Sequence, residues 1–190
     1  ALLSFDILFP SLLNGLTTGA VYALIALGLT LIYGVLHIIN FAHGAALMLA
    51  LYAVYLLRTQ LGWDPYLALP LVMAGMFALG YALQRLIINR ASHGKDENIL
   101  LVTLGLAIVM ENMALLAFSA DTRSIDTPYT LSTVPIGPAM IALPKLIAFG
   151  GALAVAALLL WIVKRTDLGR AIRAVAKEKQ GAKLMGIDVE

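Results

Sequence analysis

Five apolar segments, each long enough to cross a lipid bilayer, constrain this sequence more than any other feature. A helix needs about 20 largely apolar residues to cross a hydrocarbon core about 30 Å thick. The candidate spans run approximately over Phe9–Tyr33, Val35–Leu57, Tyr66–Ile88, Ile99–Ser119 and Pro144–Val163. The sequence therefore predicts an all-α, polytopic membrane helical bundle that lies in a lipid bilayer.

The composition supports this class and excludes several kinds of chemistry. Hydrophobic residues make up 61% of the chain and charged residues only 13%, whereas soluble domains contain about 25% charged residues. No cysteine is present, which excludes disulfides, thiolate metal sites and cysteine nucleophiles. No H-E-x-x-H motif or ordered Ser/His/Asp set occurs either. We expect a membrane protein that is not an enzyme, has no metal or cofactor of its own and does not bind nucleic acid.

The chain also lacks the motif with which many proteins bind ATP. A P-loop reads G-x-x-x-x-G-K-[ST], and the one Gly-Lys pair is Gly94-Lys95. Asn89 takes the place of the first glycine and Asp96 the place of the hydroxyl residue. Any uphill transport would therefore need energy from another subunit or from an ion gradient.

The distribution of Lys and Arg predicts the orientation, because cytoplasmic loops are enriched in both. The end of the third span, the loop after it and the C-terminal segment contain ten of the 13 basic residues. We therefore expect the N-terminus outside, and the loop 89–98 and Thr166–Glu190 in the cytosol. Residues 1–165 would form a transmembrane domain, and residues 166–190 a cytosolic segment. The outer loop Ala120–Leu143 contains three prolines and no helical period, so we expect an irregular surface loop. The N-terminus has no basic region typical of a secretory signal.

The first span contains polar side chains beside small residues. Gly15, Gly19 and Ala23 follow one another at intervals of four, which clears a helix face for close approach of another backbone. The polar side chains, which should avoid lipid, are Asn14, Thr17, Thr18 and Tyr22. Ordinary helix packing is the favoured interpretation, and a role in lining a substrate pathway is the alternative.

The second span is interrupted by polar residues in its first half. Asn40 is placed to cap a helix that begins at Phe41, and the N-terminus of such a helix would also attract an anionic group. Capping is favoured over direct substrate contact, although Asn40 and His43 are both candidate pathway residues. His37 and His43 are six residues apart and do not share a helical face, which argues against a metal site.

Glu111, followed by Asn112, lies inside the fourth span. An ionisable residue at the centre of a spanning helix costs about 3 kcal/mol on insertion scales, so this side chain should face protein or water. A pathway role for both residues and a buried interhelical hydrogen bond remain open. An ion-coupled secondary transporter or channel that uses Glu111, and a purely structural membrane subunit, are the alternatives from other classes.

The C-terminal segment, 166–190, is charged and patterned like an amphipathic helix. Arg170, Arg173 and Lys177 share one face by their spacing. The apolar side chains on the other face are Leu168, Ile172, Val175 and Ala176. Gly181 interrupts the pattern, and a second short helical piece is expected to end at Gly186. The pattern indicates a docking element at the membrane surface.

Two long motifs resemble those of the branched-chain amino acid ABC permease family. The first reads N-G-L-T-T-G-A-V-Y-A-L-I-A-L-G-L-T-L-I-Y-G and is followed by I-I-N-F-A-H-G; the second reads G-R-A-I-R-A-V-A-K-E-K-Q-G-A-K-L-M-G-I-D-V. The segment T-L-G-L-A-I-V-M-E-N between them also fits. The resemblance extends over nearly the whole chain.

The resemblance implies a permease subunit in the bacterial inner membrane. Such a subunit pairs with a second permease subunit and two ATPase subunits, which bind the ATP, and a periplasmic binding protein delivers leucine, isoleucine or valine. Related permeases for urea or short amides are an alternative. The residues that the resemblance assigns to ATPase coupling are Gly169, Arg170, Arg173, Ala176, Ala182, Leu184, Gly186 and Ile187.

The sequence departs from the family in three places. Ala45 follows Gly44 where the family usually has a glutamate, and Glu111 stands where the family often has glutamine. A carboxylate and an amide differ in charge, so we expect substrate preference or pathway polarity to differ. The family also continues through further spans after the coupling segment, so we expect this chain to be a fragment.

Overall fold

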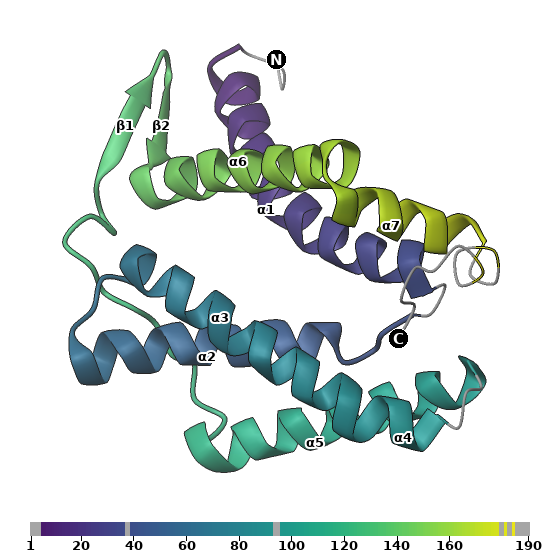
Figure 1. Cartoon of the computed structure of the whole chain (residues 1–190). Coiled ribbons are helices and arrows are strands. Elements are labelled where there is room, and N and C mark those ends of the chain that lie inside the picture. Colours follow the sequence, from purple (N-terminus) through teal and green to yellow (C-terminus); the bar gives the residue numbers. More distant parts are fainter. Residues whose placement is uncertain (1–4, 37–38, 93–95, 179–180, 182–183, 185–190) are drawn as a thin grey trace. The chain divides into compact units, whose positions relative to one another are not determined.

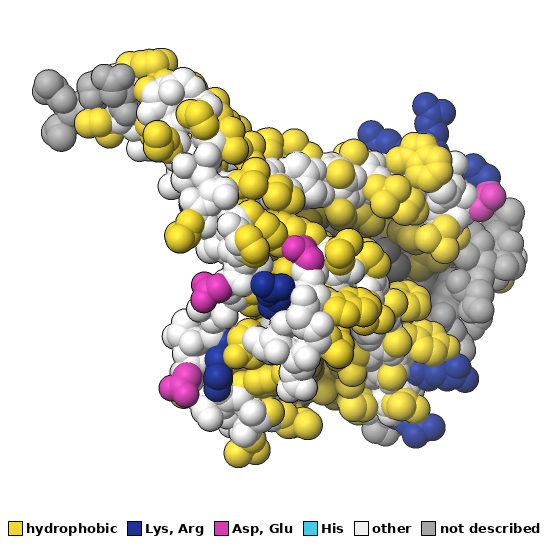
Figure 2. Space-filling model, turned by 90° about the vertical axis from the view of Figure 1, so that its left-hand side faces the viewer, with side chains coloured by type: hydrophobic (Ala, Val, Ile, Leu, Met, Phe, Trp, Pro, Cys, Tyr) yellow, Lys and Arg dark blue, Asp and Glu magenta, His cyan; other side chains and the backbone are white. Residues whose placement is uncertain are grey.

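The computed structural model describes residues 5–36, 39–92, 96–178, 181 and 184. In this part of the chain, five helices are long and apolar enough to cross a membrane. This finding confirms the predicted all-α, polytopic class and the five spans. Hydrophobic side chains cover much of the visible surface (Figure 2). Apolar surface on this scale suits contact with lipid or with other membrane helices rather than with water.

The described elements form two compact units (Figure 1). One unit contains α1, β1, β2, α6 and α7, and the other contains the elements from α2 to α5. The elements are α1 (Phe5–Leu36), α2 (His43–Leu61), α3 (Pro65–Leu83), η1 (Gln84–Ile88), α4 (Asn89–Ser92), α5 (Asp96–Phe118), β1 (Thr133–Ile136), β2 (Ala139–Ala142), α6 (Leu143–Arg165) and α7 (Asp167–Lys177). The predicted division between a membrane domain and a segment from residue 166 stays a prediction.

In the first unit, α1 and α6 lie side by side and run in the same direction (Figure 1). Lys145, near the start of α6, donates a hydrogen bond of 2.6 Å to the side chain of Asn14 in the N-terminal part of α1. At the other end, α7 follows α6 and packs against α1 as well. The first and fifth spans thus run in the same direction. Two odd-numbered spans must do so in a chain that crosses a membrane back and forth.

A short β-hairpin replaces part of the irregular loop that we predicted over Ala120–Leu143. Thr133–Ile136 pairs antiparallel with Ala139–Ala142, which leaves Gly137 and Pro138 as a two-residue turn. Gly137 has a φ of +59°, and proline fixes a negative φ at the next position. This combination is the type II′ pattern, which matches the twist of the flanking strands. The prediction was wrong here because two of the three prolines belong to the hairpin itself.

The hairpin packs against the N-terminal part of α1. A Cβ at Gly137 would lie 3.6 Å from a ring carbon of Phe9. Along β2, Ala139 and Ile141 are buried, whereas Met140 between them is 78% exposed. This alternation is typical of a strand with one packed face, so the hairpin is held onto the first span.

In the second unit, a tight turn joins α2 to α3. Gly62 ends α2 in the left-handed conformation, with a φ of 69°, which glycine adopts without steric cost. The guanidinium of Arg58 donates to the Gly62 carbonyl at 3.2 Å. Asp64 then caps α3 by accepting from the Tyr66 backbone N–H at 2.9 Å, and Pro65 occupies the first turn. The sequence of this turn therefore specifies where α2 ends and where α3 begins.

Small residues allow α2 and α5 to pack closely in the same unit. Ala42, which precedes α2, and Ala45 are buried in one cluster with Ala107 and Met110 of α5. The rings of Tyr52 and Phe118 also stack, with centroids 4.1 Å apart. The partly buried side chains around the cluster are Ala46, Leu49, Leu83 and Leu106. These contacts hold α5, the most buried of the five spans, against α2.

The predicted start of the second span is wrong by several residues. We expected this span to begin at Val35, whereas α1 continues to Leu36 and α2 begins at His43. The apolar run from Val35 has no sharp boundary, so the sequence does not show where the first helix ends. The polar residues in the first half of the predicted span nevertheless indicated an interruption there. The interruption that we inferred from these residues is therefore present between the two helices.

Candidate functional site

The polar side chains of α1 do not form one group. The buried Thr17 donates its hydroxyl to the carbonyls of Leu13 and Asn14, at 3.0 and 3.1 Å, inside its own helix. Asn14, Thr18 and Tyr22 are exposed and follow one another at intervals of four, so they share another face. Thr17 thus belongs to the packing of the first unit. The other three remain candidates for a pathway, and the Asn14 side chain also accepts from Lys145 of α6.

The small-residue face of α1 is open. Gly15, Gly19 and Ala23 are all exposed, and a Cβ built on either glycine meets no atom within 4 Å. The close backbone approach that we predicted from this spacing is therefore not made by a described helix of the same unit. A packing role for these residues would need a neighbour from outside that unit.

The segment between α1 and α2 is held by hydrogen bonds of Asn40. The Asn40 carboxamide oxygen accepts from the Ala42 backbone N–H at 2.9 Å, and the Asn40 carbonyl accepts from the His43 N–H at 3.2 Å. The prediction that Asn40 is the N-cap is wrong, because α2 begins two residues later than expected, at His43, and its N-cap is Ala42, which makes no side-chain cap hydrogen bond. Asn40 instead stabilises the turn that leads into α2, and its carbonyl pairs with the His43 N–H, a donor that has no partner within the helix.

Sequence reasoning missed a second residue that holds this segment. Thr103 of α5 is 1% exposed, and its hydroxyl oxygen accepts from the Phe41 N–H at 3.3 Å. The same hydroxyl donates to the Leu100 carbonyl at 3.1 Å. A single threonine in an apolar helix has no sequence signal that identifies its partner, because the contact joins residues far apart in the chain. Thr103 ties the start of the second span to the fourth.

Glu111 and Asn112 are both exposed on α5. The Asn112 amide donates to the Ile108 carbonyl of its own helix at 2.7 Å. Among the residues that the structure describes, none hydrogen-bonds or ion-pairs with the Glu111 carboxylate. The buried interhelical hydrogen bond that we considered for Glu111 is therefore not made within this part of the chain.

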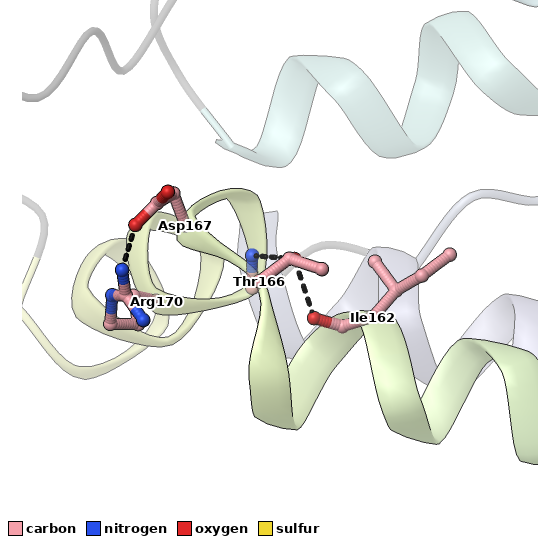
Figure 3. A network of polar contacts seen from close by, with 5 residues as sticks. Ile162, Thr166, Asp167 and Arg170 are labelled. Atoms are coloured by element: carbon pink, nitrogen blue, oxygen red, sulfur yellow. Dashed lines mark hydrogen bonds and ion pairs between the residues drawn. The ribbon is translucent and has the colours of Figure 1, made fainter.

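Thr166 forms the joint between α6 and α7 (Figure 3). Its backbone N–H and its hydroxyl both donate to the Ile162 carbonyl, at 3.1 and 2.6 Å, and so close the end of α6. The same hydroxyl oxygen accepts from the Gly169 N–H at 3.1 Å and so caps the start of α7. Asp167 in the first turn of α7 pairs with Arg170, and an acidic residue is favourable at that end of a helix.

Gly169 of α7 packs directly against the backbone at the end of α6. A Cβ at this position would lie 2.3 Å from the carbonyl oxygens of both Ile162 and Val163. Backbone atoms cannot rotate aside as a side chain can, so only glycine fits. The structure thus gives a steric reason for a glycine that the resemblance had assigned to coupling.

The faces of α7 agree with most of the predicted pattern. Arg170, Arg173 and Lys177 are exposed, while the partly buried side chains include Ile172, Val175 and Ala176. Leu168, which we placed on the packed face, is 65% exposed, because the packed face begins one residue later, at the buried Gly169.

The rest of the predicted coupling segment is described only in part. Leu184 is 87% exposed, so its side chain packs little against the described residues. The remaining predicted coupling residues, Ala182, Gly186 and Ile187, lie outside the described residues. The second helical piece that we expected to end at Gly186 therefore stays a prediction.

Comparison with known proteins identifies relatives over almost the whole chain. Residues 11–190 match the family model described as "Branched-chain amino acid transport system / permease component". The high-affinity branched-chain amino acid transport system permease protein BraD of Pseudomonas aeruginosa is 30% identical over 189 residues, which cover 93% of this chain and 62% of BraD. The corresponding LivH proteins of Salmonella typhimurium and Escherichia coli K12 are 29% and 28% identical, and 61% of each is covered. No solved structure matches the chain.

Proposed function

The chain belongs to the branched-chain amino acid transport system permease family, and from this membership we propose that it is a permease subunit of an ABC importer in the bacterial inner membrane. The observation that supports this proposal best is the family match over residues 11–190 together with five membrane-spanning helices. The chain spans 62% of the length of BraD. The transport activity of a complete subunit is therefore part of the proposal. The cargo is a branched-chain amino acid, as in the names of the relatives.

We further propose that α7 contacts an ATPase subunit on the cytosolic side. Ten of the 13 Lys and Arg residues lie between residues 85 and 95, at and just after the end of the third span, or after residue 163, and this enrichment is typical of the cytoplasmic side. In the structure α7 is short, amphipathic and attached to the end of a span through Thr166. A helix so attached can pass a displacement of the ATPase to α6 and α1, against which it packs.

In this mechanism the chain itself binds no ATP. Partner ATPase subunits bind and hydrolyse it, a second permease subunit completes the pathway, and a periplasmic binding protein delivers the amino acid. Closure of the ATPase pair would move α7, and the spans would then change between outward and inward access. The pathway candidates that remain exposed are Asn14, Thr18, Tyr22, Glu111 and Asn112.

Uptake by the reconstituted complex tests the proposal. The chain is assembled in proteoliposomes with the second permease subunit, the ATPase subunits and the binding protein, and the entry of labelled L-leucine is measured. We expect uptake that requires ATP and is lost when the P-loop lysine of the ATPase subunits is replaced. Uptake of urea or a short amide in place of leucine would contradict the proposed cargo. Uptake that follows an ion gradient without ATP would contradict the importer class.

A further inference from the structure

Glu111 is the one acidic residue within the five spans that the structure describes. It is the sixteenth residue of α5, which has 23 residues, and lies seven residues before the helix end at Phe118. At a rise of about 1.5 Å per residue, this places it about 10 Å from that end. The carboxylate is therefore well inside the thickness that a hydrocarbon core of about 30 Å occupies.

The side chain does not belong to the packed face of α5. That face contains the buried residues Ala107, Met110 and Ala114. At about 100° per residue, Glu111 is rotated by roughly 70° from the middle of this face. It is exposed, and Leu115, one turn further along, is 51% exposed on the same side. The carboxylate thus faces away from the contact with α2.

A position of this kind is unfavourable unless something compensates the charge. A charged carboxylate facing lipid at this depth is costly, and no described residue offers a cation or a hydrogen bond to it. Water in an open pathway would restore part of the lost hydration. A cation that reaches the carboxylate would restore more, through a charge-assisted hydrogen bond.

We propose that Glu111 is a specificity-determining residue that binds the ammonium group of the transported amino acid; this rests on the proposed function. An amino acid at neutral pH is a zwitterion, so its ammonium must be compensated while it crosses the membrane. Glu111 provides the opposite charge at the depth where hydration is lost. A substrate with the same carbon skeleton but no ammonium group makes no such interaction and is disfavoured.

Cysteine labelling of the assembled complex tests this proposal, because the chain contains no cysteine of its own. Leu115→Cys places a thiol one turn from Glu111. Its reaction rates with a cationic and an anionic methanethiosulfonate reagent are compared in the Glu111 and Glu111→Gln backgrounds. We expect the cationic reagent to react about tenfold faster beside Glu111, the ratio for unit charges about 6 Å apart under water-like screening, and this preference to disappear with glutamine.

Protection experiments identify the ligand group. L-leucine should slow the labelling of Leu115→Cys, whereas 4-methylpentanoate, which lacks the ammonium, should not. In the Glu111→Gln background the difference between the two should vanish. Met113→Cys is the matched control, because Met113 is 64% exposed and lies about 160° around the helix from Glu111; it should react slowly with both charged reagents.

The outcomes separate this inference from the proposed function. If the complex takes up leucine with ATP but Leu115→Cys is unreactive, or reacts without a charge preference, the inference is overturned and the importer class stands. If Glu111→Gln prevents assembly with the second permease subunit, the carboxylate pairs with protein and the inference is likewise overturned. If the unmodified complex shows no ATP-dependent leucine uptake, the proposed function itself fails.

Discussion

Gly169→Ala is expected to displace α7 from the end of α6 while the five spans remain inserted. The added Cβ would lie 2.3 Å from two backbone carbonyl oxygens, so α7 would have to move. We expect a cost of about 3 kcal/mol, the upper end for overpacking, which corresponds to roughly a hundredfold shift in the equilibrium between docked and detached α7. An isolated helix of 11 residues is marginal in water, so a detached α7 should unfold.

Limited trypsin digestion measures this effect, since Arg170 and Arg173 lie within α7. When opening is fast relative to cleavage, the cleavage rate follows the population of the open state, so it should rise by about a hundredfold. Gly150→Ala in α6 is the matched control, because a Cβ there meets nothing within 4 Å and alanine is favoured over glycine in a helix. Cleavage of Gly169→Ala at the unmodified rate would show that α7 does not depend on this close approach.

Thr103→Val is expected to destabilise the segment that precedes α2. Valine keeps the shape of threonine but removes the hydroxyl that accepts from the Phe41 N–H. A donor left without a partner costs about 2 kcal/mol, so the Phe41 amide should exchange with solvent about 30-fold faster. Hydrogen exchange of residues 39–43 in nanodiscs would measure this change.

Thr103→Ser separates the hydrogen bond from packing. Serine keeps the hydroxyl and loses one methyl group, which contributes about 0.8 kcal/mol when buried. Overall stability should therefore fall slightly, while the Phe41 amide keeps its protection. Equal loss of protection in the serine and valine variants would mean that packing, rather than the hydroxyl, holds this segment.

The sequence predicted the spans because lipid imposes a length and a composition on each one. It also predicted the exposed basic residues of α7, since amphipathic spacing is a local property. The start of α2 was misplaced because the apolar run from Val35 has no sharp boundary. The hairpin was missed because we read Pro135 and Pro138 as signs of irregular structure, whereas Gly137 and Pro138 together form a favourable turn.

Other features could not be predicted because they depend on which helices meet. The burial of Thr103 and its bond to Phe41 join residues that are 62 positions apart. The clash that forbids a side chain at Gly169 arises from the close approach of α7 to the end of α6. The π-helical segment η1 at Gln84–Ile88 also has no recognisable signature in the sequence. Glu111 was recognised from its charge, but the face on which it lies was evident only from the packed face of α5.

The proposed role of α7 can be tested most directly with a single cysteine at Glu178, an exposed residue that follows α7. Its labelling by a membrane-impermeant thiol reagent is measured in inverted and right-side-out vesicles, with and without the ATPase subunits. We predict labelling in inverted vesicles alone, and slower labelling when the ATPase subunits are added. Labelling from the outer side, or labelling that the ATPase subunits leave unchanged, would contradict a cytosolic coupling role for α7.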